Sequence, residues 1–309
     1  MSITTLYNTE KSLKNFSDAL EYTRGLNPLA ADIAMHMKAG DDSFGIVEQF
    51  ANNVSKPIFE VISTQQGLDA AKKKYDDAVE NLPDQAQKTI MTVLFSAPEK
   101  IRHNAMDMLT HCLEHSDIDT QTDFLISAPF DHGLIENGRV DLDESRKMIA
   151  ASTPEAQAYI LGACTQEATT NLGLYAFNVR VPQSNTAMAM MRDPSDAVIP
   201  FDQIENDLVR AYCEDHEKQI RNSVEMLDPD LSKEILDKLE KVYAEHNLPF
   251  DRDAENNRRS QEFRDHIAGM TRNDYWEIFK GHAQVIQVIL EHQAGLDLKP
   301  NAKDTHEHD

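Results

Sequence analysis

Apolar residues recur every three to four positions along most of the chain, the spacing of helices that bury one face. In residues 8–24 the large apolar side chains lie near one face, so a helix is predicted there. A second helix is predicted over 28–40, and short amphipathic helices are predicted over 43–115. Breaks between the short helices are expected at four places: Lys56-Pro57, Gln66-Gly67, Pro83 and Pro98.

Residues 120–150 lose this spacing. The dipeptide Asn137-Gly138 lies between apolar pairs, which is a strong signal for a tight turn between two strands, and a β-hairpin is predicted over 134–142. Helices resume at Thr153-Pro154, a combination typical of a helix start. Further helices are predicted over 203–227, 231–246, 256–270 and 273–293, the last capped by Asn273 or Asp274.

Together these elements predict an all-α protein. Its expected architecture is a stack of antiparallel helix pairs, an α-solenoid, interrupted by a small β-hairpin insertion. Four regions are expected: an N-terminal helical-repeat region over 1–118, a connector with the hairpin over 119–152, a C-terminal helical region over 153–294, and a flexible tail over 295–309.

Three helical segments share one pattern: a large apolar residue, two variable residues, a small residue, an aliphatic residue and a glutamate. They begin at Phe16, Tyr75 and Leu109, and the last two lie 34 residues apart. Ala71 and Ala105 precede the last two by four positions. This pattern resembles the second helix of a tetratricopeptide repeat, in which a small residue is followed four positions later by an aromatic one and a proline closes the unit.

The resemblance covers about 70 residues. It departs from the family in the first helices, where Ile58, Phe59 and Ile62 stand in place of leucine, glycine and tyrosine. A generic stack of helix pairs without kinship is the alternative.

The resemblance implies that a protein partner binds the inner face of the first helix of each pair. In this register that face contains seven residues: Asn53, Lys56, Glu60, Thr64, Gln87, Ile90 and Leu94. Ile90 and Leu94 have an alternative placement, facing the next helix pair.

Residues 111–115 read His-Cys-Leu-Glu-His, the H-x-x-E-H signature of the inverted zincin peptidases. In that family the third zinc ligand is a glutamate about 75 residues downstream, and here that window offers only Asp193. The repeat register places Ala105, Leu109, Cys112 and Leu113 in the core, and turns His111, Glu114 and His115 toward water. We therefore expect no metal and no catalytic residue, with a zinc metallohydrolase as the alternative.

The net charge of −23 changes the expected partner. An acidic surface repels phosphate backbones and anionic lipids, so neither nucleic acid nor membrane is expected to bind. The same field attracts a basic protein surface, although acidity can also serve solubility alone.

Three widely spaced cysteines form no CxxC pair or disulfide framework, which indicates a reducing compartment. Cys164 and Cys213 are candidate nucleophiles, Cys213 with His216 three residues later, but small buried residues of helix packing fit them better. The chain contains no apolar run of 18 residues, so a cytoplasmic protein is expected.

These features predict a monomeric, non-enzymatic protein without a cofactor, which binds another protein and inhibits or chaperones it. Its acidic, helical, motif-poor composition is similar to that of regulators and effectors that intracellular bacteria translocate into host cells. Such delivery would require a dedicated secretion system.

Overall fold

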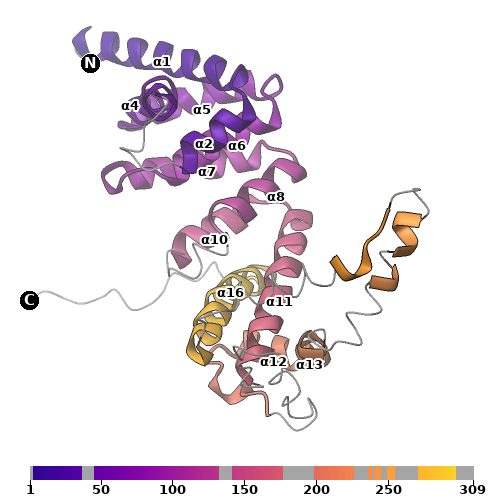
Figure 1. The fold of residues 1–309 in the computed structure, drawn as a ribbon. Helices are drawn as coiled ribbons and strands as arrows, with labels where there is room; N and C mark the ends of the chain where they lie inside the picture. Colours follow the sequence, from indigo (N-terminus) through magenta and orange to yellow (C-terminus); the bar gives the residue numbers. More distant parts are fainter. Residues whose placement is uncertain are drawn as a thin grey trace, which may run out of the picture. The chain divides into compact units, whose positions relative to one another are not determined.

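Helices make up nearly all the regular structure of this chain (Figure 1). The computed structural model describes residues 3–36, 45–131, 141–176, 198–225, 236–238, 240–244, 249–254 and 271–296. These residues are mostly helical and include no strand, so the all-α class is confirmed for them. The predicted hairpin falls almost wholly on 132–140, outside the described residues. None of the described helices is long and apolar enough to cross a lipid bilayer.

The chain divides into two compact units, Met1–Leu161 with Gly295–Asp309, and Gly162–Ala294. The division falls within one helix, α11. The expected boundaries at residues 118 and 152 mark no such division, and the four regions stay a prediction.

The first unit contains a series of short helices that follow one another closely along the chain. They are α1 (Ile3–Arg24), α2 (Pro28–His36), α3 (Ile46–Phe50), α4 (Lys56–Val61), α5 (Gln65–Val79), α6 (Asp84–Phe95), α7 (Arg102–Glu114), α8 (Ile118–Ser127), α10 (Leu142–Ala151) and the start of α11 (Pro154–Ala176).

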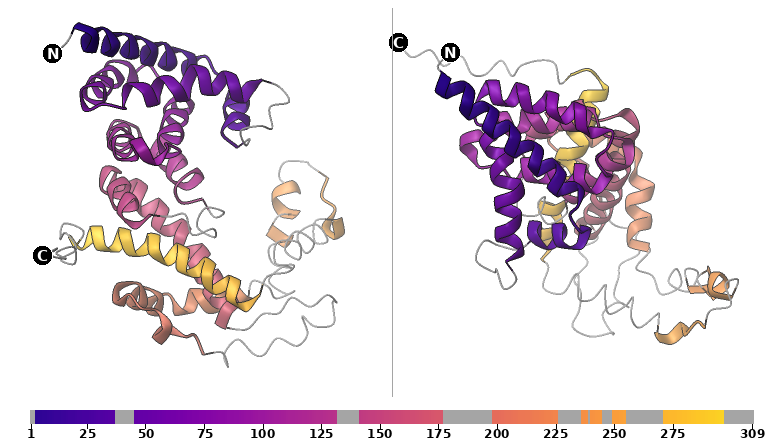
Figure 2. Two further views of the ribbon diagram at one scale, coloured as in Figure 1. Left: turned by 90° about the vertical axis from the view of Figure 1, so that its left-hand side faces the viewer. Right: turned by 90° about the horizontal axis from the view of Figure 1, so that it is seen from above.

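From α4 to α10 these helices are stacked (Figure 1, Figure 2). α4 contacts α5, α6 packs on α7 and α8, and α7 packs on α5 and α10. The long α1 lies against α4, α5 and α6, and α2 also contacts α6. The fully buried large side chains of these helices include Phe16, Ile58, Tyr75, Ile90 and Leu109.

The expected break at Lys56-Pro57 does not occur. A π-helical turn over Ala51–Ser55 joins α3 to α4, and the Lys56 amide donates to the Ala51 carbonyl, five residues back. Proline has no amide hydrogen, and its ring clashes with the carbonyl four residues back in a regular α-helix. The wider π turn accommodates that ring, so the chain stays helical through Pro57.

The break expected at Gln66-Gly67 falls slightly earlier, at Thr64. The Thr64 hydroxyl caps α5 by accepting a 3.1 Å hydrogen bond from the Gly67 amide. A Cβ at Gly67 would lie 1.9 Å from the Val61 carbonyl oxygen. Gly67 is therefore required by the close approach of two backbones.

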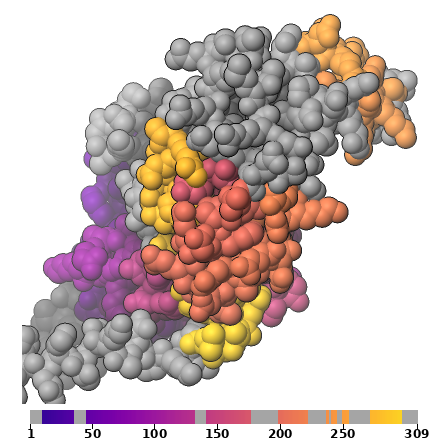
Figure 3. Space-filling model, turned by 90° about the horizontal axis from the view of Figure 1, so that it is seen from below, coloured from indigo at the N-terminus to yellow at the C-terminus, as the bar shows by residue number. Residues whose placement is uncertain are grey.

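The second unit holds α12 (Asp207–Asp215), α13 (Glu217–Glu225) and α16 (Arg272–Gln293). The single helix expected over 203–227 is divided at His216. α12 packs on α16, and both reach the surface in Figure 3. The predicted helix over 256–270 lies outside the described residues.

The N-cap of α16 is Thr271, in place of the expected Asn273 or Asp274. The Thr271 hydroxyl accepts a hydrogen bond from the Asp274 amide, and the Asp274 carboxylate accepts one from the Thr271 amide. This reciprocal capping box satisfies two amides of the first turn and places the helix start one turn ahead of Tyr275.

Candidate functional site

The buried face of α7 follows the predicted register. Ala105, Leu109, Cys112 and Leu113 are all fully buried. Residues four apart on a helix share a face, so His111 and His115 lie one turn apart, side by side. Their rings are separated by 4.3 Å between centroids.

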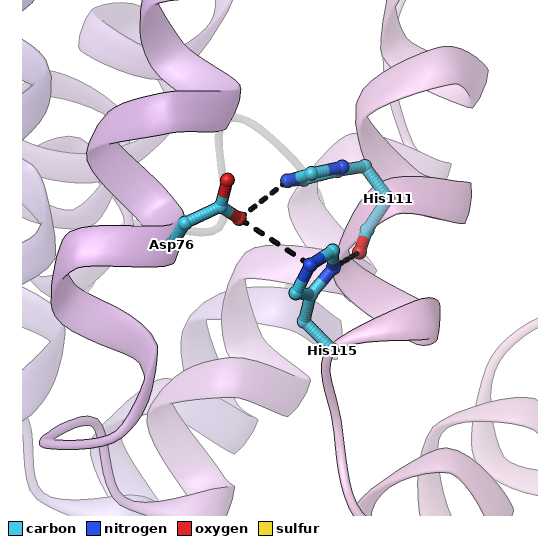
Figure 4. Close-up of side chains that lie close together, drawn as sticks. All are labelled: Asp76, His111 and His115. Atoms are coloured by element: carbon cyan, nitrogen blue, oxygen red, sulfur yellow. Dashed lines mark hydrogen bonds and ion pairs between the residues drawn. The ribbon is translucent and has the colours of Figure 1, made fainter.

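Asp76 of α5 completes a cluster with these two histidines (Figure 4). Its Oδ1 lies 2.6 Å from His111 Nε2 and 3.7 Å from His115 Nε2. Glu114 and His115 are exposed as predicted, but the His111 side chain is only 16% exposed because it fills the contact between α5 and α7. The expectation that His111 faces water is therefore wrong.

A backbone carbonyl orients the His115 ring. His115 Nδ1 lies 2.8 Å from the His111 carbonyl oxygen, which can only accept, so Nδ1 carries the hydrogen. The lone pair of the neutral ring is then on Nε2, the atom nearest Asp76. Metal-binding histidines are commonly oriented by such a hydrogen bond from the second ring nitrogen.

The three residues can therefore hold a metal ion. One ligand atom from each of Asp76, His111 and His115 lies within 4.8 Å of the others. Imidazole nitrogen with carboxylate oxygen is a donor set that suits zinc and related divalent transition metals.

The sequence search missed Asp76 because it looked downstream of the histidines. Asp193, the residue found there, lies outside the described residues. Asp76 precedes His111 by 35 residues, and the ion pair of Lys72 with Asp107, 3.5 Å long, joins the same helices with the same separation one turn earlier. The signal was the 34-residue spacing of the segments that begin at Tyr75 and Leu109, since the helices that carry them, α5 and α7, lie side by side.

The neighbouring Tyr75 and Cys112 belong to the core rather than to this cluster. Both side chains are fully buried, and the edge of the Tyr75 ring packs against His111 with centroids 6.4 Å apart. Burial raises the pKa of the Tyr75 phenol and of the Cys112 thiol. Neither group is therefore ionised near neutral pH, and neither is a suitable anionic ligand.

The seven residues predicted to bind a partner fall into two groups. Four are exposed along the π turn, α4 and the cap of α5; they are Asn53, Lys56, Glu60 and Thr64, and we call them the α4 surface. Gln87, Ile90 and Leu94 of α6 are buried. They form no open groove, because α6 is contacted by α1, α2, the π turn over Ala51–Ser55, α7 and α8.

Buried Gln87 has a structural role. Its Nε2 donates a 3.0 Å hydrogen bond to the Leu82 carbonyl in the loop before α6. Its Oε1 accepts a 3.0 Å hydrogen bond from the Ser116 hydroxyl in the loop before α8. The amide thus joins the loop before α6 to the loop before α8.

Gln121 and Gln157 repeat this arrangement. Each is buried at the fourth position of its helix, α8 or α11, as Gln87 is in α6. Gln121 donates to the Leu113 and Ser116 carbonyls at 2.9 and 3.1 Å. Gln157 donates to the corresponding Ile149 and Ser152 carbonyls at the same two distances.

The side-chain oxygen of Gln121 forms hydrogen bonds as well. Its Oε1 accepts hydrogen bonds from the amide and hydroxyl of Thr153, in the loop before α11. The glutamines lie 34 and 36 residues apart, and this spacing was the sequence signal that went unused. We call Gln87, Gln121 and Gln157 the glutamine ladder.

The two candidate nucleophiles of the second unit are unsuited to that role. Cys164 and Cys213 are buried free thiols, and burial raises the pKa of each to about 12. The thiolate is the nucleophilic form, so little of it exists near neutral pH. The ring of His216 stacks on Tyr212, and its Nδ1 lies 2.7 Å from the Tyr212 carbonyl oxygen. This geometry fits the alternative, in which both cysteines are helix-packing residues.

Comparisons with known proteins supply no relative from which to carry over an activity. No protein-family model, no curated protein and no solved structure matches this chain.

Proposed function

We propose that this chain is a non-enzymatic binding protein whose first unit is an α-solenoid of helix pairs. The glutamine ladder carries the proposal. In three helices, α6, α8 and α11, the same buried side chain at the same helix position donates a hydrogen bond to a carbonyl of the loop before that helix, five residues earlier in each case. Such recurrence is typical of repeat proteins, in which each unit buries its face against the next.

The packing order supports the same architecture. α7 contacts both α5 and α10, and α8 contacts α6. In this proposal the first helices of successive pairs, α6 and α8, therefore pack on one another, and so do the second helices, α5, α7 and α10. The resemblance of the Ala71 and Ala105 registers to tetratricopeptide repeats agrees with this order. The hairpin before α10 stays part of the proposal. Stacks of this kind present an extended surface, which many of them use to bind proteins.

We assign the α4 surface, reduced from the seven predicted residues to the four exposed ones, as the first place to look for the partner. It combines one acidic side chain with polar groups and the ammonium of Lys56. The net charge of −23 favours a partner with a basic surface, through long-range attraction that salt screens. In this proposal the protein acts as a monomer that inhibits or chaperones its partner.

The three buried free cysteines support a reducing compartment, so we place the protein in the cytoplasm of the cell that makes it or of a host into which it is translocated.

Affinity capture from the cells of its source organism tests this proposal. The wild-type chain is compared with a variant carrying Asn53→Lys and Glu60→Lys. Glu214→Lys, at an exposed position of α12, is the control for charge reversal. We expect a partner that the wild type and the control retain, that the double variant loses, and that raised salt releases. A partner held equally by all three chains and indifferent to salt would place the interface away from the α4 surface.

Zinc-dependent hydrolysis is the second candidate function. The observation in its favour is that Asp76 supplies a third ligand beside His111 and His115. By the pattern of the inverted zincins, Glu114 would then be the general base. Zinc-loaded wild type and Glu114→Gln are compared on a protein substrate such as casein. We expect equal background from both, whereas cleavage lost in Glu114→Gln would establish the hydrolase.

A further inference from the structure

Asp76, His111 and His115 bring three ligand atoms within 4.8 Å of one another, an arrangement that a cation can bind. The hydrogen bond at His115 Nδ1 leaves a lone pair on Nε2, 3.7 Å from a carboxylate oxygen that also carries lone pairs. Two acceptors facing one another are stabilised by a positive charge between them. On the other side of the same oxygen, His111 Nε2 at 2.6 Å shares a proton with Asp76. A metal ion can take the place of that proton.

We infer that these three side chains bind one divalent transition-metal ion, for which zinc is the best fit, and that the ion fastens α5 to α7. Zinc binds imidazole nitrogen and carboxylate oxygen at roughly 2.0–2.2 Å, so tetrahedral ligands lie about 3.3–3.5 Å from one another. The two distances from Asp76 Oδ1, 2.6 and 3.7 Å, bracket that value. The ligand atoms of all three residues lie within 4.8 Å of one another, so the two histidines are also near this spacing.

The scaffold favours such a site. His111 lies in the last turn of α7 and His115 is its C-cap residue, at the four-residue spacing that puts two imidazoles on one metal, and Asp76 comes from the neighbouring helix α5. The side chains of Asp76 and His115 are 42% and 40% exposed, so an ion can enter and a water molecule can occupy the fourth position. His111 is held on its inner side by the buried Tyr75 ring.

This inference goes beyond partner binding and does not depend on it. The ligands belong to two successive helix pairs, which in a stack contact each other mainly through their facing helices. An ion there would stiffen the contact between the pairs. It would stabilise the first unit whether or not a partner is bound.

Zinc binding to the full-length protein tests the site. The chain is stripped with a chelator, loaded with zinc alone and dialysed, and we expect elemental analysis to find one tightly held zinc per chain. With free zinc at about 100 times its Kd, the Tm should rise by roughly 5–10 °C.

Asp76→Asn and His115→Gln each remove one ligand while keeping the size of the side chain. Both positions are exposed, so folding should survive, which circular dichroism verifies. Each change should weaken zinc by at least roughly 100-fold, since even loss of an outer partner of a metal ligand costs about 10–100-fold. The rise in Tm should disappear with it.

Two control variants separate this site from other histidines. His103→Gln alters an exposed histidine of the same helix, and the double change His306→Gln with His308→Gln removes those near the C-terminus. Both should keep the tightly held zinc and the rise in Tm. Absence of stoichiometric zinc in the wild type, or tight zinc that survives in Asp76→Asn and His115→Gln, would overturn the inference.

Discussion

Gln121 of α8 donates a 2.9 Å hydrogen bond to the carbonyl of Leu113, eight residues earlier near the end of α7. The last carbonyls of a helix lack the regular amide donor four residues further on. The Leu113 carbonyl accepts a 3.1 Å hydrogen bond from the Ser116 amide, and the glutamine side chain adds a second donor from the start of the next helix. Gln157 of α11 donates a 2.9 Å hydrogen bond to the carbonyl of Ile149, near the end of α10.

Gln121→Leu should lower the free energy of unfolding strongly, although leucine is close to glutamine in size. The substitution leaves the Ser116 carbonyl without its side-chain donor, and a buried group left unsatisfied costs about 1–3 kcal/mol. The Leu113 carbonyl loses the glutamine but keeps its hydrogen bond from the Ser116 amide. Urea unfolding measures the loss. Gln66→Leu, at an exposed position in the first turn of α5, is the matched control and should change the free energy of unfolding by less than about 0.5 kcal/mol. Equal effects of the two changes would contradict the structural role of the ladder.

Leu109→Ala should cost about 2–5 kcal/mol of unfolding free energy, because a fully buried side chain leaves a cavity when it is truncated. His115→Ala, two turns away on the exposed side of α7, should cost less than about 1 kcal/mol in metal-free protein, since exposed ion pairs contribute little. Thermal or urea unfolding in the presence of chelator compares them. If His115→Ala proved the more costly change, the register of α7 would be incorrect.

Gly67→Ala and Gly162→Ala should have opposite effects. The added Cβ at Gly67 would meet the Val61 carbonyl oxygen at 1.9 Å, and the backbone shift needed to relieve this should cost at least about 2 kcal/mol. At Gly162, within α11, nothing lies within 4 Å of the added Cβ. Alanine there should stabilise by about 0.5–1 kcal/mol, because glycine in a helix loses more backbone entropy on folding. Melting temperatures of both variants test the pair, and a stable Gly67→Ala protein would disprove the close approach.

Cys164 and Cys213 should resist alkylation in the folded protein. Burial raises the pKa of each thiol from 9.0 to about 12, which lowers the thiolate fraction at pH 8 roughly 1,000-fold. Iodoacetamide labelling followed by mass spectrometry should show both thiols unmodified when native and modified in urea. Rapid labelling of the native protein would reveal an accessible, reactive cysteine.

The same thiols should make the fold sensitive to alkali. Their pKa values are higher in the folded chain than in the unfolded one, so the stability they contribute is fully present below pH 9. It is lost as the pH rises from 9 toward about 12, because the unfolded chain releases these protons first. Replacing both residues with alanine should flatten the dependence of the unfolding free energy on pH in that window, relative to its value at pH 8.

The sequence by itself determined the helical class and the register of α7. Apolar residues at helical spacing must share a face, and a chain can hide that face only against other helices, so Ala105, Leu109, Cys112 and Leu113 could be assigned to the core. The 34-residue spacing of the segments that begin at Tyr75 and Leu109 is also a property of the sequence alone. The predicted helix break at Pro57 was wrong, because a π turn over Ala51–Ser55 accommodates the proline ring and the chain stays helical.

Tertiary structure decided which faces stay open and which polar residues meet. Nothing local to α6 indicates that α1 and α2 cover it, so Gln87, Ile90 and Leu94 could be assigned to a groove although they are buried. The meeting of Asp76 with His111 and His115 depends on two helices lying side by side in one direction. Spacing along a helix sets which residues share a face, but only the packing of separate helices sets what that face contacts.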